Sequence, residues 1–404
     1  MGSTAVSDLD AMLKVTFNSG SLENFAKRKS PIFRQIPQLD KLYGTSAELY
    51  FNTSMGSGAS HTYANAKANA VTGAGYKMDV TRAKLYGVVD MEAEAMLAAS
   101  KDMGSYLNLI TKNVADRAME LEQVFCRELF LSSSTVAIGT ITAASGSGPY
   151  DVTVSEGDII NFYDGQRLNI DDTSSGASPD TSIWTVSRVN YSANTMRLTV
   201  ATAGSQNPST TWKYLIPESD AAASVLKGFG AWLTGGTPDT LFGLDRTPAP
   251  AQLCGFGETV SATIEEAAKN LARKVLRFAD ITNTALVLSS ANWQKLENEL
   301  GSRVRRDDAA EKKFGTSAIS LSTPGGAVAC IADPFANDSY SYMLDLNTWQ
   351  YWGCGPLPHI IGSRPGEDGN YVRKKESTDA YTIEWRGLGN LVCTRPINNG
   401  RLTH

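Results

Sequence analysis

The sequence predicts an α+β fold, and three observations support this prediction. Residues 47–90 contain two strand-like segments joined by a long polar stretch, as in an extended β-hairpin. Residues 102–131 carry apolar side chains at the spacing of one long amphipathic helix. From about residue 260 onward, strand-like and helix-like segments alternate, which indicates a separate compact region.

The composition is that of a soluble globular protein. The 404 residues are 42% hydrophobic with a mean hydropathy of −0.21, and this length usually forms two or three domains. The 35 glycines favour many turns and a large β content. The first 13 residues lack a long apolar stretch, and no segment approaches the roughly 18 apolar residues of a membrane-spanning helix. We therefore expect no signal peptide, no contact with a membrane, and folding in the cytoplasm.

Charge and cysteine content limit the classes of partner. The net charge of −5 shows that the whole protein is not a polycation, so any contact with DNA must be local. The five cysteines are scattered and form no CxxC pair, so buried free thiols are expected rather than disulfides or a zinc site. They are Cys126, Cys254, Cys330, Cys354 and Cys393.

Residues 1–44 lack sustained periodicity, and Pro31 and Pro37 interrupt the later part, so we expect an arm that lies on another surface. Between residues 21 and 44, five basic residues and two acidic ones give a net charge of +3 (five minus two). One interpretation is a solvated charge run. The other is an arm that faces DNA and neutralises its phosphates. The candidate DNA-facing residues are Lys27, Arg28, Lys29 and Arg34.

In the predicted hairpin, residues 48–51 begin one strand and residues 76–82 form the returning strand. Between them lie Gly56 and Gly58, followed by a polar, alanine-rich stretch at 63–70. This tip has almost no large aliphatic side chain and cannot bury itself. It must be mobile or packed on a partner.

The helix at 102–131 has Asp102 as its expected N-cap, and three consecutive serines, residues 132–134, end it. At a rise of 1.5 Å per residue it would be about 40 Å long. A single long helix beside an extended hairpin suits a flat, elongated subunit better than a compact enzyme.

Residues 135–216 carry short β-type runs at 152–154, 183–186 and 196–200, separated by turn-forming residues. They predict a small β-sandwich or barrel inserted after the long helix. Residues 217–260 are loop-rich. Beyond them, Thr263 and Glu266 have capping-box spacing and begin a helix whose apolar face continues to Phe278. A buried strand at 285–288, a helix at 293–300 and strands at 327–332, 341–346 and 381–388 follow.

No catalytic, cofactor-binding or metal-binding motif is recognisable. Of the three histidines, His61, His359 and His404, none has a second histidine at metal-ligand spacing, and His404 is expected to be disordered. There is no nucleophile elbow, phosphate loop or dinucleotide fingerprint. The carboxylate pairs at 171–172 and 307–308 are expected to be solvated charges in loops.

Residues 301–308 are expected to close a helix and to open a polar loop that reaches Gly326. One interpretation is an exposed loop. The alternative is a contact between symmetric copies, because opposite charges on one loop can pair around a ring of identical subunits. The charged residues are Arg303, Arg305, Arg306, Asp307 and Asp308.

Several segments, in their order and spacing, resemble the major capsid (major head) proteins of tailed bacteriophages. They cover most of the chain outside residues 1–44 and 135–216. The segments are 60–69, 81–87, 94–100, 226–233, 296–304, 332–334, 343–349, 379–381 and 389–391.

This resemblance implies the Hong Kong 97-like capsid fold. In such proteins an N-terminal arm and an extended loop reach onto neighbouring subunits, a long spine helix and a sheet form a peripheral domain, and an axial domain meets its copies at the fivefold and sixfold axes. By position, the resemblance assigns residues 1–44 to the arm, 45–90 to the extended loop, 91–134 to the spine helix, 135–216 to a β-rich insertion, 217–260 to a connector, 261–375 to the axial domain, and 376–404 to the return strand of the peripheral domain and the C-terminus.

The implied function is a structural one, without catalysis. Copies of the chain would form pentamers and hexamers of an icosahedral head shell around double-stranded DNA, within a virion assembled in the bacterial host cytoplasm. Because the extended loop begins near residue 45, we expect a separate scaffolding protein or none, besides portal and decoration proteins. The alternative is another virion β-protein, a decoration or tail component with a glycan-binding insertion. The expected inter-subunit contacts are the charged residues of 303–308 together with His61, Tyr63, Asn65, Lys67, Lys77 and Arg82.

Overall fold

The computed structural model describes most of the chain after residue 29, and within the long helix it describes side chains from residue 113 onward. The chain divides into two compact units that exchange segments along the sequence. Residues 84–125 and 354–388 belong to the first unit, and residues 30–83, 126–353 and 389–404 to the second. The described residues are 30–94, 103–132, 135–176, 179–202, 206–218, 225–279, 283–355, 359–361, 372–375 and 378–404.

The second unit is built on a six-stranded mixed sheet. We call residues 256–345 together with 400–403 the sheet domain, because all six strands come from these residues. Two of the neighbouring strand pairs are parallel and three are antiparallel. In sheet order the strands are β13 (Phe256–Thr259), β22 (Gly400–Thr403), β17 (Tyr340–Asp345), β14 (Thr284–Leu288), β16 (Gly326–Ala332) and β15 (Ala318–Thr323).

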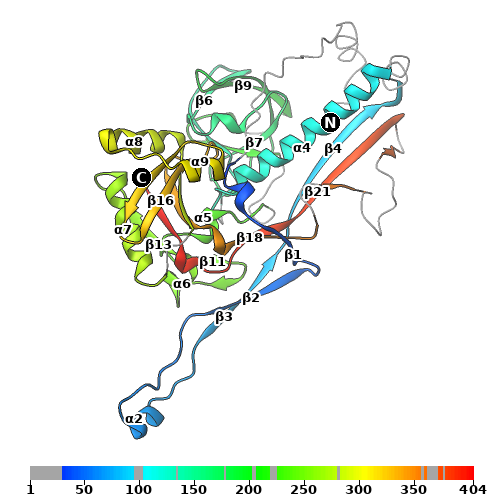
Figure 1. Cartoon of the computed structure of the whole chain (residues 1–404). Coiled ribbons are helices and arrows are strands. Elements are labelled where there is room, and N and C mark those ends of the chain that lie inside the picture. The colour runs from blue at the N-terminus through cyan, green and yellow to red at the C-terminus, as the bar shows by residue number, and fades with distance from the viewer. Residues whose placement is uncertain are drawn as a thin grey trace. The chain divides into compact units, whose positions relative to one another are not determined.

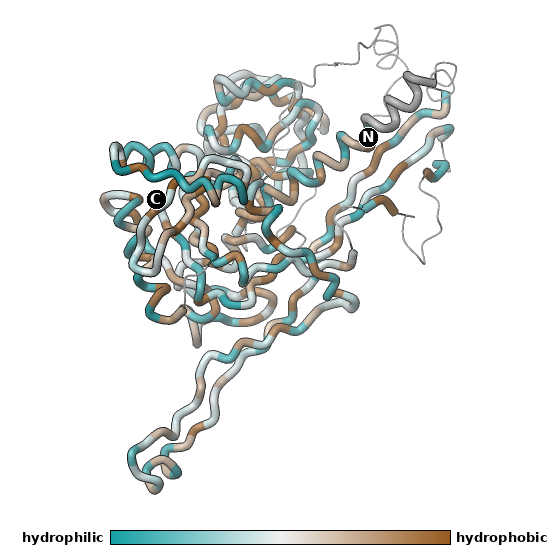
Figure 2. The backbone as a smooth tube through the Cα atoms, viewed as in Figure 1, coloured by the Kyte–Doolittle hydropathy of each residue, from teal (hydrophilic) through white to brown (hydrophobic). Residues whose placement is uncertain are grey.

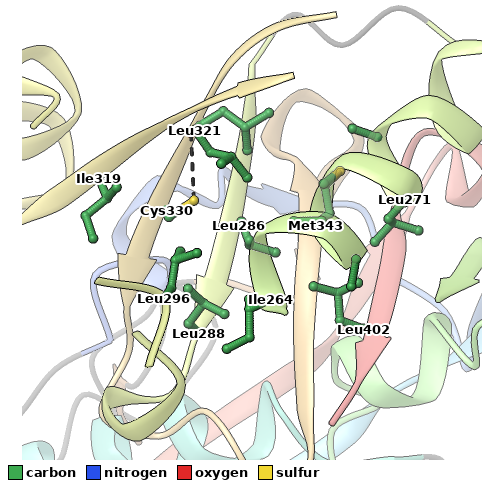
Figure 3. Packing of buried hydrophobic residues seen from close by; sticks show 14 of the residues in the cluster. Ile264, Leu271, Leu286, Leu288, Leu296, Ile319, Leu321, Cys330, Met343 and Leu402 are labelled. Carbon is green, nitrogen blue, oxygen red and sulfur yellow. Dashed lines mark hydrogen bonds between the residues drawn. The ribbon is translucent and has the colours of Figure 1, made fainter. Parts of the chain in front are cut away.

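Helices α7 (Ile264–Leu276) and α8 (Ser290–Leu300) cover the apolar face of this sheet. Leu271 of α7 and Leu296 of α8 are fully buried against strand residues such as Leu286, and Figure 3 shows these side chains converging on one core. Each buried leucine contributes about 1.5–3 kcal/mol by leaving water. The predicted strands at 285–288, 327–332 and 341–346 and the predicted helix at 293–300 are confirmed.

Two side chains accept hydrogen bonds from the free N–H groups at the start of α7. The side chain of Thr263 accepts a hydrogen bond from the Glu266 N–H at 3.2 Å, as the capping-box spacing predicts. A second acceptor comes from α8, where Glu299 accepts the N–H groups of Ile264 and Glu265 at 2.8 and 3.2 Å. The prediction that Phe278 continues the apolar face is wrong. The helix ends at Leu276, and the Phe278 side chain is 64% exposed.

Residues 139–217 form a closed six-stranded barrel, seen as a ring of strands in Figure 1. The predicted sandwich or barrel is therefore a barrel, and its interior is filled by its own apolar side chains, with Trp184 and Phe162 among the largest. Closure removes the free strand edges that would otherwise invite pairing with another chain. Around the barrel the strands are β10 (Tyr214–Pro217), β5 (Gly139–Ser145), β6 (Tyr150–Val154), β9 (Thr195–Thr202), β8 (Ile183–Asn190) and β7 (Arg167–Asp171).

The connector between barrel and sheet domain contains only short elements, held together by one buried cation. Arg246 is fully buried and donates to the carbonyl oxygens of Ala231 and Trp232 at 2.8 Å each and to that of Leu253 at 3.2 Å. It also pairs with Asp239. The two terminal nitrogens of this buried guanidinium thus have acceptors, whereas its Nε–H has none. The elements are α5 (Phe229–Trp232), β11 (Thr240–Leu241), β12 (Leu244–Asp245) and α6 (Pro250–Cys254).

The segment 30–42 packs on its own chain, which corrects the expectation that all of residues 1–44 lies on another surface. The Ser30 hydroxyl donates to the buried carboxylate of Asp333, and Ile32 is fully buried. Farther along, β1 (Gln38–Asp40) pairs in parallel with β18 (Trp349–Gly353). Sequence periodicity did not reveal this because these contacts join residues about 300 positions apart.

The hairpin consists of β2 (Ser46–Asn52) and β3 (Gly75–Thr81), which pair in antiparallel register from Ser46 opposite Thr81 to Asn52 opposite Gly75. The predicted range was too long. After Thr81 the chain enters β4 (Ala83–Glu92), which belongs almost entirely to the first unit and pairs with β21 (Ala380–Cys393). Figure 1 shows the hairpin extending from the rest of the second unit with a short helix, α2 (Tyr63–Ala68), at its end.

The first unit contains β4, most of β21, the short strands β19 (His359–Ile360) and β20 (Arg373–Lys374), and most of α4 (Met103–Glu128). Helix α4 confirms the predicted long helix, while its expected N-cap, Asp102, lies outside the described residues. Its Val114 packs on a small core of Val89, Met91 and Ile383. No helix in the described part of the chain is long and apolar enough to cross a membrane.

The expected domain boundary between residues 261–375 and 376–404 does not match the sheets, because strands after residue 375 belong to both sheets. Strand β22, close to the C-terminus, lies between β13 and β17 inside the sheet domain, and residues 389–393 of β21 pair with β18. Residues 354–361, in contrast, belong to the first unit. Cys254, Cys330 and Cys393 are buried free thiols as expected, whereas Cys354 is only half-buried.

The buried segment 30–36 generates a stability prediction. Ile32→Ala in the full chain should lower the free energy of unfolding by about 2–5 kcal/mol, because a fully buried isoleucine leaves a cavity. Arg34→Ala, two residues away and exposed, should change it by less than about 0.5 kcal/mol. Urea unfolding of the unassembled subunit measures both. Equal and small effects would show that this segment does not pack on its own chain.

Candidate functional site

In the described part of the chain, no three His, Cys, Asp or Glu residues lie close enough to share a metal ion. The three histidines lie on separate elements: His61 is exposed beside α2, and His359 is in β19 next to Arg386. His404 is ordered, contrary to expectation, because its ring contacts the Ser341 hydroxyl at 2.6 Å.

The stem of the hairpin has two different faces because alternate residues of a strand point to opposite sides. One face is apolar and packed on the subunit, with Phe51, Met78 and Val80 buried. The other face is exposed and carries Glu48, Tyr50, Lys77 and Asp79 (Figure 2 shows the alternation along the stem).

The exposed face holds a small ionic network. The Lys77 ammonium pairs with Glu48 and lies 3.3 Å from Asp79, while the Tyr50 hydroxyl donates to Glu48. These hydrogen bonds, that of Lys77 foremost, hold the pKa of the Glu48 carboxyl below its usual value. Lys77, an expected inter-subunit contact, thus already has partners across the hairpin, which fixes its position on this face.

Hydrogen bonds of the backbone hold the tip of the hairpin, residues 53–74, in shape. Almost none of its side chains are buried. Ser57 and Val71 exchange N–H···O bonds of 3.1 and 2.8 Å. Gly56 has a positive φ of 78°, and any side chain there would overlap the Val71 carbonyl oxygen. The tip is therefore a defined backbone shape that presents its side chains outward.

The tip carries three large apolar side chains, and nothing in the described chain covers them. Tyr63 is 83% exposed, Met55 is fully exposed, and Val71 is 65% exposed. Exposed apolar groups gathered in one place mark an interaction surface more strongly than scattered ones do. Four expected contact residues on or beside α2 are exposed as well: His61, Tyr63, Asn65 and Lys67. Another expected contact residue, Arg82 between β3 and β4, is half-buried.

The charged segment 303–308 is not the long polar loop that was expected. A short 3-10 turn, η3 (Gly301–Arg303), is followed by α9 (Asp308–Phe314) and by β15, and residues 305–307 lie along the edge of β15. The bonds are Asp307 N–H to the Ala318 oxygen at 3.1 Å and Ser320 N–H to the Arg305 oxygen at 2.7 Å. Asp307 at the N-cap and Lys312 and Lys313 in the last turn were the overlooked helix signal.

The five charges of this segment have different roles. Arg303 pairs with Glu265 at 3.0 Å, and Arg306 lies 4.0 Å from Glu311. The Asp307 carboxylate is the N-cap of α9 and accepts from the Ala310 N–H at 3.0 Å. Arg305 and Asp308 are exposed. Arg305 lies beside the edge of β15, and Asp308 begins α9.

The expected DNA-facing residues are less well placed. Arg34 is exposed in a short 3-10 turn, and Lys27, Arg28 and Lys29 lie outside the described residues. Lys41, counted with them in the net charge, is directed onto its own chain, where its ammonium lies 5.0 Å from the Trp352 ring centre.

Sequence reasoning also missed some features. Asp171 was expected to be a solvated charge, but it is buried in β7 and accepts the Thr173 N–H at 2.9 Å. Phe278 stacks on Phe256 at 5.4 Å between ring centres, which leaves an exposed aromatic face at the edge of the sheet domain. No local pattern distinguishes such residues, because their burial depends on which distant strand lies opposite.

Comparison with known proteins supports the fold. No protein-family model matches this sequence, and no curated protein matches it. Among solved structures, the chain is similar to that of the cyanophage A-1(L) capsid asymmetric unit, with a TM-score of 0.56 and 12% identity over 97% of both chains. The capsid of the native GTA particle matches with a TM-score of 0.48 and 11% identity, over 100% of this chain and 99% of the other.

A further match is the holo-SrpI encapsulin complex from Synechococcus elongatus PCC 7942, with a TM-score of 0.46 and 10% identity, over 100% of this chain and 96% of the other. The first of these similarities is strong enough to establish the fold, and its coverage extends over nearly the whole chain. The chain therefore has the fold of a phage capsid protein, as its resemblance implied.

Substitution of Asp307 and Asp308 in turn should distinguish a side chain that stabilises the fold from one that is merely exposed. Asp307→Ala should lower the free energy of unfolding by about 1 kcal/mol, because the first turn of α9 loses its cap. Asp308→Ala should change it by only a few tenths of a kcal/mol, since this side chain is exposed. Thermal unfolding of unassembled subunits compares them, and a larger loss for Asp308→Ala would reverse the assignment.

Proposed function

We propose that this protein is a major capsid protein that self-assembles into the icosahedral head shell of a tailed phage. The observation that carries the proposal is the hairpin tip, whose apolar side chains Tyr63, Met55 and Val71 are exposed on a defined backbone. An extended tip of this kind gains stability only when another surface covers it. The phage capsid fold makes a second copy of the chain the partner that best fits.

The proposed roles follow the Hong Kong 97-like arrangement. Residues before Ser30 would be the arm, the hairpin β2–β3 the extended loop, α4 the spine helix, β4 and β21 the peripheral sheet, and the sheet domain the axial domain. The barrel would be the β-rich insertion. Its interior is filled by its own side chains, so no described feature favours the alternative of a glycan-binding virion protein.

Pentamers and hexamers would form through the sheet domain. Around a ring of copies, Arg305 of one subunit would meet Asp308 of the next, a heterologous contact that closes by rotation. Each exposed ion pair is worth only about 0.2–1 kcal/mol. Many such contacts in one shell, together with the hairpin, would act as multivalent links.

The shell would enclose double-stranded DNA without reading its sequence. Lys27, Arg28, Lys29 and Arg34 would neutralise phosphates locally, which reconciles DNA contact with a net charge of −5. The protein would have no catalytic role, would assemble in the bacterial host cytoplasm and would reside in the virion. A separate scaffolding protein, a portal and decoration proteins would be its other partners.

Shortening the hairpin tests the main proposal. Because Asn52 lies opposite Gly75, replacing residues 53–74 by a two-residue Asn-Gly turn keeps the stem closed. The shortened subunit should unfold at the same temperature as the full chain within about 3 °C, since the tip buries little. Electron microscopy should show shells or capsomers for the full chain and none for the shortened one.

Tyr63→Ala tests the same contact with a smaller change, and Val200→Ala on the barrel, also exposed, is the matched control. Tyr63→Ala should reduce the yield of assembled particles, and Val200→Ala should not. Normal shells from the shortened chain, or a full chain that stays monomeric under all assembly conditions, would refute the proposal.

A charge exchange tests the ring contact. Arg305→Asp and Asp308→Arg should each weaken association, and the double variant should restore it because the opposite charges are exchanged rather than lost. One exposed pair of up to about 1 kcal/mol corresponds to roughly fivefold in association. Light scattering at low and high salt measures this, with Arg273→Asp, exposed on α7, as the control. Loss without rescue in the double variant would exclude the pairing.

A further inference from the structure

The connector contains a second, much smaller hairpin, in which β11 and β12 pair around a two-residue turn. We call residues 239–246 the bracket. Strand β12 lies alongside β3 of the long hairpin, within the second unit, and Figure 1 shows β11 near the base of that hairpin. None of the proposed contacts between subunits involves the bracket.

The bracket has one apolar and one polar face. Directly opposite residues of an antiparallel pair place their side chains on the same face. Leu241 lies opposite Leu244, and the first is buried while the second is half-buried. On the other face Thr240 lies opposite Asp245, and both are exposed. The bracket therefore covers something with its leucine face.

The stem of the long hairpin offers a matching apolar face. Met78 and Val80 are only 1% and 0% exposed, although the polar residues that alternate with them face water. Both belong to β3, the strand that β12 lies alongside. Apolar surfaces that leave water together stabilise their contact. We therefore assign the leucine face of the bracket to the buried face of the stem.

Arg246 closes the root of the bracket. Its N–H donates to the Asp239 carbonyl oxygen at 3.1 Å, and its guanidinium pairs with the Asp239 carboxylate, so the two ends of the bracket are joined twice. The same guanidinium donates to the carbonyl oxygens of Ala231 and Trp232 in α5 and of Leu253 in α6. One buried side chain thus closes the bracket and fixes it to both neighbouring helices.

The turn of the bracket is held as well, in a conformation that its sequence disfavours. Phe242 has a φ of 48° and Gly243 a φ of 78°, as a turn with two left-handed residues requires. A bulky residue rarely adopts a positive φ, and such strain persists only where the surroundings impose it. Here the Phe242 ring lies 5.9 Å from the ring of the fully buried Trp232.

The bracket and the base of the stem are attached to the same two residues of β21. The Trp232 indole N–H donates to the Leu391 carbonyl oxygen at 2.9 Å. The neighbouring Asn390 is buried, and its amide donates to the carbonyl oxygen of Thr81, the last residue of β3, at 3.0 Å. The Asn390 side-chain oxygen accepts the N–H of Lys227 in the connector at 2.9 Å. Stem and bracket therefore share one attachment within the second unit.

We propose that the bracket sets the direction in which the long hairpin leaves the second unit, with Leu244 as its contact on β3 and Arg246 as the positioning residue. This inference rests on the proposed function, because direction matters only to a tip that must meet another copy. A fixed direction leaves fewer orientations to be lost on association. If the tip pointed correctly in about one subunit in ten, each contact would be about tenfold weaker.

Distances between spin labels on the unassembled full-length subunit test the bracket. Labels attached through a ketone-bearing unnatural side chain at Ala59 in the tip and Lys312 on α9, both exposed, leave the five native cysteines unchanged. The native sequence should give one narrow distance distribution. Leu244→Ala removes the contact on β3, so it should broaden this distribution and reduce the yield of particles. Thr240→Ala, on the exposed face of the bracket, is the matched control and should change neither.

Arg246→Lys tests the positioning residue. A lysine keeps the charge but lacks the planar fork that reaches four acceptors, so the distance distribution should broaden here too. Hydrogen exchange of residues 284–288 and 340–345 in the sheet domain should stay unchanged, whereas a merely structural role of Arg246 would lower protection there. If Arg246→Lys does not fold, the milder Leu244→Ala still decides.

A distribution that stays narrow in Leu244→Ala, or that broadens equally in Thr240→Ala, would overturn the proposal. The distances are measured before assembly, so failure of the bracket and failure of the proposed function are distinguishable. A broad distribution in Leu244→Ala together with a normal yield of shells would support the bracket and contradict the role of the hairpin in assembly.

Discussion

The pairing of β22 between β13 and β17 is the constraint on which the rest of this structure depends. Its four residues, Gly400–Thr403, complete a sheet whose other strands come from residues 256–345. Without β22 the sheet would split into a separated β13 and a four-stranded remainder, and the apolar face beneath α7 would be incomplete. Leu402, fully buried in the shared core, shows how the last strand contributes to this face.

Because of this long-range closure, the sheet domain cannot be cut out as one continuous stretch of chain. Between Asp345 and Gly400 the chain leaves the domain, enters the first unit with residues 354–388 and returns through residues 389–393 of β21. Contacts between residues so far apart in sequence form slowly, because the loop must close before the contacts stabilise it. The same interleaving joins the two units covalently at several points along the chain.

The surfaces outside this core differ in whether their charged and apolar side chains have partners within the described chain. Arg303, Arg306 and Asp307 are used within the chain, and the free edge of β15 is covered by residues 305–307. The hairpin tip, in contrast, has satisfied backbone groups but exposed apolar side chains. A surface of that kind remains stable in water and gains stability when another surface covers it.

The sequence by itself determined the elements whose signal is local. The 3.6-residue period predicted α4, the Thr263 cap predicted the start of α7, and apolar runs predicted β14, β16 and β17, because each signal lies within a few turns or one strand. Only the tertiary structure decided that Ser30 meets Asp333, that Asp307 caps a helix while Asp308 stays exposed, and that Asp158 and Asp338 line one cavity. Those outcomes depend on which distant residues come together, and a carboxylate in a sequence looks the same whether it will be solvated, capped or buried.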